Sequence, residues 1–326
     1  MTGVTDRYPW LIEPWQQLTR RLDRMPHAIL LAGPVGLGKN QFAIDLAGTL
    51  LCTESQDDNP CGKCKSCKLF SAKTHPDIRI ITLLEEAKSI SIDQIREITS
   101  YLALTPHTAD CKILILTPAE AMTLQAANSL LKQLEEPPGN SILILVSPAP
   151  HQLPQTIRSR CARIEIKAPP VEEATLWLAN QKLSQEDITV VLSAAGGAPL
   201  AALSLAQHGY IDTRQSLLEQ LLAISNGGTP LRCAEQWQKT GTELALRWFY
   251  GFLLDILKLA LGARELENLA TTKFTSAVST AANRMPANKV TELLEAVNEA
   301  RQLIATPVEQ RLLLEDILIR WNKVYA

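Results

Sequence analysis

The sequence lacks an uninterrupted apolar segment long enough to cross a membrane. A bilayer-spanning helix needs roughly 20 consecutive apolar residues, and none occurs in these 326 residues, although 46% of them are hydrophobic. The start, MTGVTDRYPW, has no basic region followed by an apolar core, so no secretory signal is expected. Both absences predict a cytoplasmic protein with no membrane partner.

An excess of charge of one sign is also missing. The chain carries 32 Lys and Arg against 34 Asp and Glu, a formal net charge of -2. A chain with this balance has no general attraction for nucleic acid or for membrane surfaces. There is no internal repeat or low-complexity tract, and the length allows two or three domains with at least one substantial core.

The first half of the chain alternates short apolar runs with helical patterns. Strands that are apolar throughout and separated by helices indicate a parallel sheet covered on both faces. After Ala168-Pro-Pro170 the strand signal stops and only helical patterns follow. We therefore expect an α/β domain at 1–167, a small three-helix lid at 168–208 and an all-α domain at 209–326. The predicted strands are 28–32, 77–83, 112–117, 141–146 and 162–167, and the predicted helices between them are 39–51, 91–102 and 119–136.

Residues 33–40 read GPVGLGKN and stand between an apolar strand and a helix. Glycines at 33, 36 and 38 allow backbone N–H groups to face phosphate oxygens without a Cβ in the way. The helix that follows directs its positive end at the anion, and Lys39 would contact the outer phosphates of a triphosphate. The order of strand, glycine loop, lysine and helix favours a phosphate loop over a glycine-rich turn with a chance lysine.

The residues that would hold magnesium are substituted. In hydrolysing phosphate loops a Ser or Thr hydroxyl and an acidic residue after a later strand help to bind Mg²⁺. Here Asn40 follows the lysine, and the strand at 112–116 leads into Thr117-Pro-Ala-Glu120 without an acidic pair. Glu120 is expected to lie too far along, at the start of the next helix. We predict a domain that retains the nucleotide-binding shape, binds ATP weakly or not at all, and has lost hydrolysis.

Four cysteines form a candidate metal site within the segment CTESQDDNPCGKCKSC. Four thiolates at this spacing suit a tetrahedral structural zinc. An iron–sulfur cluster and a redox pair are the alternatives, but no other feature indicates electron transfer. Lysines 63, 65, 68 and 73 are interpreted as a solvated face rather than a DNA contact, and Cys111 and Cys233 as packed thiols. The predicted zinc module spans 52–67, with ligands Cys52, Cys61, Cys64 and Cys67.

Arginine is concentrated just before the last predicted strand, at Arg158, Arg160 and Arg163. An arginine at a subunit edge can reach a neighbour's triphosphate and neutralise charge in the transition state, because its charge is permanent and its donors are forked. The alternative is a surface arginine paired with nearby carboxylates, and spacing alone favours that alternative slightly.

Several segments together resemble those of bacterial clamp loaders, the AAA+ proteins of the DNA polymerase III holoenzyme. The resemblance covers residues 8 to 205 strongly and the C-terminal helices, including Arg311 to Asp316, more weakly. The segments that carry it, in order, are Tyr8-Pro-Trp-Leu11, GPVGLGKN, the four-cysteine insert, Thr74-His-Pro-Asp77, Asn128-Ser-Leu-Leu-Lys-Gln-Leu-Glu-Glu-Pro-Pro138 and Ser159-Arg-Cys161.

The resemblance implies a role in a ring-like pentamer. Gamma and tau motor subunits hydrolyse ATP, whereas a stator subunit does not. Motor subunits carry Ser or Thr after the lysine, an acidic pair after the third strand and an arginine in the lid. Asn40, Thr117 to Glu120 and the arginine-free segment 197–201 all favour the stator.

For such a stator the resemblance implies that Arg160 acts in trans as an arginine finger and that 209–326 joins an oligomerising collar. The implied partners are gamma or tau, delta, the beta sliding clamp and primed DNA, at the nucleoid-associated replisome. The chain would be an accessory subunit of a DNA-directed DNA polymerase, a nucleotidyltransferase, and no enzyme by itself. Two alternatives stay open: an active ATPase motor subunit with unusual metal ligands, and a zinc-stabilised DNA-binding module.

Overall fold

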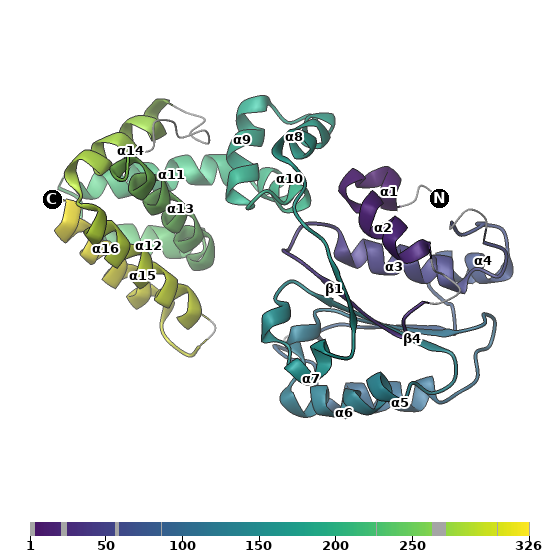
Figure 1. Ribbon diagram of the computed structural model, residues 1–326. Coiled ribbons are helices and arrows are strands. Elements are labelled where there is room, and N and C mark those ends of the chain that lie inside the picture. Colours follow the sequence, from purple (N-terminus) through teal and green to yellow (C-terminus); the bar gives the residue numbers. More distant parts are fainter. Residues whose placement is uncertain are drawn as a thin grey trace. The chain divides into compact units, whose positions relative to one another are not determined.

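A parallel sheet of five strands organises the first of the two units into which the chain divides, Met1–Pro169 and Pro170–Ala326 (Figure 1). The structure is a computed structural model and describes residues 4–20, 25–55, 59–85, 87–225, 227–262, 272–304 and 306–325. The strand order is β2-β3-β4-β1-β5, and every neighbouring pair is parallel. The strands are β1 (Ala28–Ala32), β2 (Ile78–Ile81), β3 (Lys112–Leu116), β4 (Ser141–Ser147) and β5 (Ala162–Glu165).

Helices cover both faces of this sheet, as the sequence predicts. Figure 1 shows α3 on one face and α5 and α6 on the other. The three inner strands β1, β3 and β4 are buried along their whole length, whereas the edge strands β2 and β5 are partly exposed. The helices of this unit are α1 (Val4–Arg7), η1 (Pro9–Leu11), α2 (Ile12–Thr19), α3 (Lys39–Leu51), α4 (Lys65–Ser71), α5 (Ile92–Leu102), η3 (Ala119–Ala121), α6 (Leu124–Glu135), η4 (Pro150–Gln152) and α7 (Gln155–Arg158).

The helix predicted at 119–136 begins later than the sequence suggests. Residues 119–121 form the 3-10 turn η3, and α6 starts at Leu124 after the Thr123 side chain accepts the N–H of Ala126. The segment between them is held by backbone bonds to Ile90, which donates to Ala121 O and accepts from Thr123 N. This pairing keeps the intervening residues out of a helical conformation.

Both edge strands are shorter than predicted. The strand predicted at 77–83 is Ile78–Ile81, because its partner β3 ends at Leu116 opposite Ile81. The strand predicted at 162–167 ends at Glu165, opposite the last residue of β1. The short helices α1, η1, α2 and α4 were not predicted, since none is long enough to show a helical period of apolar residues.

The described residues of the second unit form helices and turns and no strand, and the core of this unit includes residues from α8 to α16. The three helices predicted within 168–208 are observed as α8, α9 and α10. The aromatic core includes Trp248 stacked on Phe252 at 5.5 Å and Trp321 stacked on Tyr325 at 4.8 Å between ring centroids. The helices are α8 (Val171–Asn180), α9 (Gln185–Ala194), α10 (Pro199–Gln207), α11 (Tyr210–Ser225), α12 (Pro230–Thr240), α13 (Thr242–Ala260), α14 (Thr272–Arg284), α15 (Ala287–Leu303) and α16 (Gln310–Tyr325).

In the described parts of the chain, no single helix is both long and apolar enough to cross a membrane. The pair α9 and α10 passes by length and composition together, but it is bent by 113°. Both helices of that pair contribute buried residues, among them Val191 and Ala202, to the core of the second unit.

Candidate functional site

The glycine loop connects β1 to α3 at the carboxyl edge of the sheet. Gly36 and Gly38 have φ angles of 82° and 86°, in the left-handed region that favours glycine. Gly33 also has a positive φ, and a Cβ there would lie 2.0 Å from the carbonyl oxygen of Ile166. The backbone of the loop therefore requires these glycines, and their N–H groups stay unobstructed by side chains of their own.

Lys39 is the first residue of α3 and is buried, with 6% of its surface exposed. Its Nζ donates to the carbonyl oxygen of Pro34 in the same loop at 2.5 Å. Burial lowers the pKa of Lys39 to about 8, and the nearby charge of Glu120 opposes that shift. The ammonium group is thus held at the loop, where an anion would relieve its desolvation.

The two positions that would bind magnesium contact each other. Thr117 follows β3, and its hydroxyl donates to the side-chain oxygen of Asn40 at 2.8 Å. Both groups are neutral, and the bond engages the amide oxygen that would otherwise face a cation. Because Mg²⁺ is usually bound by at least one carboxylate in such sites, a neutral amide–hydroxyl pair is a poor replacement.

Glu120 lies nearer to the loop than the sequence indicates. It belongs to the turn η3 directly after β3, rather than to the helix α6. Its charge acts on Lys39, and its buried Oε2 has no hydrogen-bond partner in the described ranges. The expectation that Glu120 is remote, at the start of the next helix, is therefore wrong, because the helix begins only at Leu124.

The N-terminal segment packs against the glycine loop, a contact that the sequence did not reveal. Trp10 donates its indole N–H to Leu37 O at 2.9 Å and stacks on Tyr8 at 5.5 Å between ring centroids. A Cβ at Gly38 would lie 3.1 Å from the Tyr8 ring. In the sequence, Tyr8 to Leu11 is one of the segments that carry the family resemblance. In the structure, Tyr8 and Trp10 of this segment contact the glycine loop directly.

The four predicted metal ligands come together in one cluster. The sulfurs of Cys52, Cys61, Cys64 and Cys67 all lie within 4.8 Å of one another. Cys52 and Cys64 are 3.9 Å apart, and Cys61 and Cys67 are 4.0 Å apart. A tetrahedral zinc with Zn–S bonds of about 2.3 Å needs sulfur separations of about 3.8 Å. The spacing of the sulfurs therefore fits a tetrahedral metal ion.

Backbone N–H groups support the cluster chemically. The N–H groups of Lys63 and Cys64 point at Cys61 Sγ, and that of Cys67 points at Cys64 Sγ, at 3.3–3.4 Å. Burial opposes ionisation of Cys64, but hydrogen bonds, led by the one from Cys67, lower its pKa to about 6. Burial raises the pKa of Cys52 and of Cys67. Binding of a metal cation would ionise such thiols, and this donor set suits zinc.

The motif Thr74 to Asp77 fixes the cluster to the sheet. The buried His75 accepts the N–H of Asp77 at Nδ1 (3.0 Å), so Nε2 carries the proton and donates to Ser66 in α4 (2.8 Å). Ser66 in turn donates to Leu51 O at the end of α3. The fully buried Asp77 accepts the N–H groups of residues 107–109 at 2.7–3.0 Å. No local sequence pattern could have revealed these contacts between distant segments.

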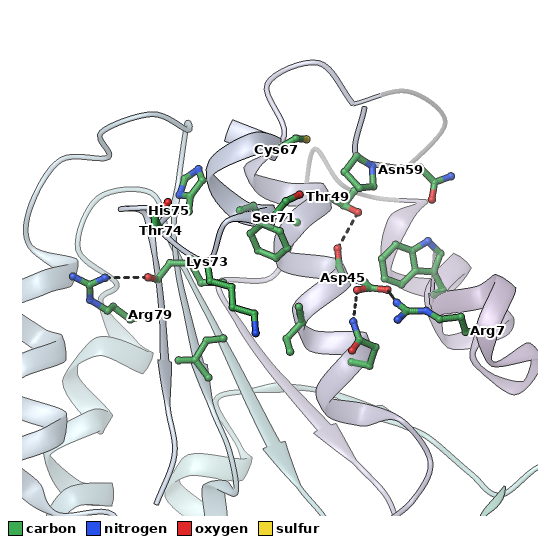
Figure 2. A pocket seen from close by; sticks show the side chains of 18 of the residues that line it. Arg7, Asp45, Thr49, Asn59, Cys67, Ser71, Lys73, Thr74, His75 and Arg79 are labelled. Atoms are coloured by element: carbon green, nitrogen blue, oxygen red, sulfur yellow. Dashed lines mark hydrogen bonds and ion pairs between the residues drawn. The ribbon is translucent and has the colours of Figure 1, made fainter. Parts of the chain in front are cut away.

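Beside the cluster lies a cavity of about 960 Å³ between α1, α2, α3, α4 and the edge strand β2. Figure 2 shows Cys67, Thr74 and His75 on one side of it, and Arg7 paired with Asp45 on the other. None of the loop residues 33–40 lines this cavity. It is therefore separate from the predicted phosphate site.

The predicted finger lies just after α7. Arg160 Nε donates to Glu135 Oε1 at 2.8 Å, and Nη2 lies 2.5 Å from the same oxygen. Its Nη1 donates to Thr156 O at 3.0 Å. The side chains of Arg160 and Glu135 are 35% and 50% exposed, so a partner molecule can reach both. The sequence alternative, a pairing with a carboxylate of the same chain, is thus observed.

The other singled-out side chains behave as ordinary structural groups. Lys63, Lys65, Lys68 and Lys73 are all exposed. Cys111 and Cys233 are buried, as predicted, and burial raises their pKa values to about 11 and about 12.

A parallel sheet in this order, with a glycine loop and lysine after β1 and helices on both faces, defines a phosphate-loop unit of the AAA+ class. Two family models match the chain: "DNA polymerase III, delta subunit" at residues 11–170 and "DNA polymerase III, delta subunit, C terminal" at residues 208–323.

Curated relatives agree with the family models. The DNA polymerase III subunit delta' of Pseudomonas aeruginosa is 34% identical over 325 residues, 98% of each chain. That of Escherichia coli K12 is 30% identical and covers 96% of this chain and 94% of its own. The chain belongs to the DNA polymerase III delta' subunit family.

More distant likenesses accompany these relatives. The subunit tau of Bacillus subtilis is 33% identical over 67% of this chain, which corresponds to 37% of tau. Among solved structures, a gamma-subunit-related protein of Thermotoga maritima has 21% identity and a TM-score of 0.47, covering 96% of this chain and 100% of its own.

Proposed function

We propose that this chain is the non-hydrolysing stator of a clamp loader, an accessory subunit of DNA polymerase III with no ATPase of its own. In this role it assembles with gamma or tau and delta, with α8–α10 as the lid and α11–α16 in the collar. The complex loads the beta sliding clamp on primed DNA at the cytoplasmic replisome. Arg160 serves the ATP site of a neighbouring motor subunit in trans.

The hydrogen bond between Thr117 and Asn40 supports this proposal best. At 2.8 Å the two side chains satisfy each other where a motor would hold magnesium. Charge that develops on a transferred phosphoryl group needs a metal for neutralisation. The loop and Lys39 are kept, so weak ATP binding is compatible with the proposal, whereas hydrolysis is not.

We also propose that the cysteine cluster binds one structural zinc ion. The sulfur separations and the N–H groups directed at the sulfurs support this choice. The module lacks a large apolar core of its own, and zinc binding contributes on the order of 10 kcal/mol in small zinc peptides. Zinc would therefore fix the four cysteines against α3 and the sheet.

The alternative is an active motor subunit, and the position of Glu120 is the observation that favours it. Its buried Oε2 is unpaired among the described residues, and its charge acts on Lys39. If Glu120 replaces the missing acidic ligand, the purified chain will hydrolyse ATP with magnesium, and both Lys39→Ala and Glu120→Gln will abolish that turnover. A chain that is inactive before either substitution rejects the alternative.

The finger is tested in the reconstituted loader. We expect Arg160→Ala to leave assembly intact and to lower DNA-stimulated ATP turnover, because a trans-acting arginine neutralises transition-state charge. Arg163→Ala is the matched control, since Arg163 lies in β5 and pairs with Glu165. Turnover that stays at the wild-type level with Arg160→Ala rejects the role of the finger.

A further inference from the structure

The contacts of Arg160 leave its outer end available. Nε and Nη2 lie against the single oxygen Glu135 Oε1, and Nη1 donates to Thr156 O. One N–H therefore remains on each of the two terminal nitrogens. A pair of N–H groups, one on each terminal nitrogen, is the set of donors that a phosphate group accepts from arginine in a bidentate contact.

The two anchors of Arg160 stand on rigid elements. Glu135 is the last residue of α6, and Thr156 lies in α7. Their neighbours Leu134 and Ile157 are buried in the core of the first unit, with 1% and 0% of their surfaces exposed. In addition, a ring nitrogen of His27 bonds to Leu134 O at 2.8 Å and holds the end of α6 to the start of β1. Such support fixes the plane of the guanidinium group better than a loop would.

We infer that Glu135 is a positioning residue, which orients Arg160 so that its two remaining N–H groups face the phosphates bound by the neighbouring motor subunit. This inference rests on the proposed function of Arg160. An arginine that already lies in its working rotamer loses less conformational entropy when it meets the phosphate, and positional errors of about 1 Å in such a group can cost about a hundredfold in rate.

The adjacent Glu136 provides a matched control. Both residues are exposed glutamates at the end of α6, but among the described residues no hydrogen bond or ion pair joins the side chain of Glu136 to another residue, and only its backbone N–H bonds, to Lys132 O. A general effect of negative charge near the site would appear with either substitution. An effect through Arg160 would appear only with Glu135.

The test uses the full reconstituted loader, with assembly checked by gel filtration. The measurement is phosphate release in a single turnover. The ATP site next to Arg160 contributes one fraction of the total phosphate released, and the rate of that fraction is compared between variants. We expect Glu135→Gln to slow that fraction about ten- to hundredfold, and Glu136→Gln to leave it unchanged. Glu135→Asp keeps the charge but is shorter by one methylene group, so a positioning role predicts that it is also slow.

A double substitution separates the inference from the proposed function. In the Arg160→Ala background, Glu135→Gln should produce no further loss. If Arg160→Ala slows the fraction but Glu135→Gln does not, or if the two losses multiply, the positioning role is overturned while the finger stands. If Arg160→Ala itself has no effect, the proposed function fails first.

Discussion

Two places in the first unit can be compared as metal sites. One has a complete set of potential metal ligands, and the other has neutral side chains where magnesium ligands would stand. The cysteine cluster keeps four sulfurs within 4.8 Å of one another, supported by backbone N–H groups. The place for magnesium beside the glycine loop holds Asn40 and Thr117, which bond to each other. A structural zinc needs a closed set of four donors, whereas a catalytic magnesium needs charged oxygen ligands beside the substrate phosphates. Under the proposed function, the first unit keeps the phosphate-loop scaffold without the magnesium ligands that hydrolysis requires.

Loss of the zinc is expected to have the largest effect. Cys64→Ser should remove the bound metal and destabilise the first unit by more than about 4 kcal/mol, as the loss of a structural metal does. Elemental analysis should find about one zinc per wild-type chain and none in the variant. Cys233→Ala, a buried thiol of the second unit, should keep the metal. Iron, or no metal in the wild-type chain, contradicts the assignment.

The next largest effect on stability is expected for substitution of Asp77. Its carboxylate binds the backbone of residues 107–109 and so joins the segment before β2 to that loop. Asp77→Asn should cost about 2–3 kcal/mol, since three N–H groups lose a charged acceptor. The measurement is urea unfolding at pH 7. Asp93→Asn, the same substitution at an exposed aspartate, is the control. A loss below about 0.5 kcal/mol would contradict this role.

The pH dependence of Asp77 follows from the same bonds. Burial opposes its ionisation, but the N–H groups of residues 107–109 outweigh this and hold the pKa of Asp77 below its usual range. The stabilisation is therefore complete above about pH 3.9, the pKa in the unfolded chain, and is lost as the pH falls toward the folded pKa. Asp77→Asn should remove this part of the acid sensitivity.

Lys39 gives the most diagnostic effect on the loop side of the comparison. Its folded pKa of about 8 lies below that of the unfolded chain, so the unfolded chain binds more protons between about pH 8 and pH 10.4. Stability should therefore rise with pH through that window, by at most about 3 kcal/mol if the whole pKa difference is realised, and the rise should be absent in Lys39→Met. Denaturant unfolding of the wild-type chain and of the variant at several pH values measures this rise.

The sequence predicted the inner strands well, because β1, β3 and β4 are buried on both faces and consist of apolar residues throughout. The sequence also predicted that the four cysteines form one cluster, because their close spacing in the chain is a local pattern. It failed at the start of α6, where Ile90, more than thirty positions earlier, binds the backbone around Met122. The edge strands were overextended because their ends depend on where a neighbouring strand stops.

The functional details that the sequence missed are contacts between distant segments. Asn40 and Thr117 were each recognised as substitutions, but their mutual hydrogen bond joins residues 77 positions apart. Glu135 was part of a motif without a role until α6 and α7 placed it beside Arg160. Such pairings depend on the packing of the sheet and its helices, so the printed order of residues could not reveal them.

We propose, above all, that the phosphate loop of this chain no longer supports hydrolysis. The direct measurement is the release of inorganic phosphate from ATP by the purified chain with magnesium, compared with a loader reconstituted from motor subunits. We predict no release above the uncatalysed background from the isolated chain. Steady release at the rate of a motor subunit would show that the loop still supports hydrolysis.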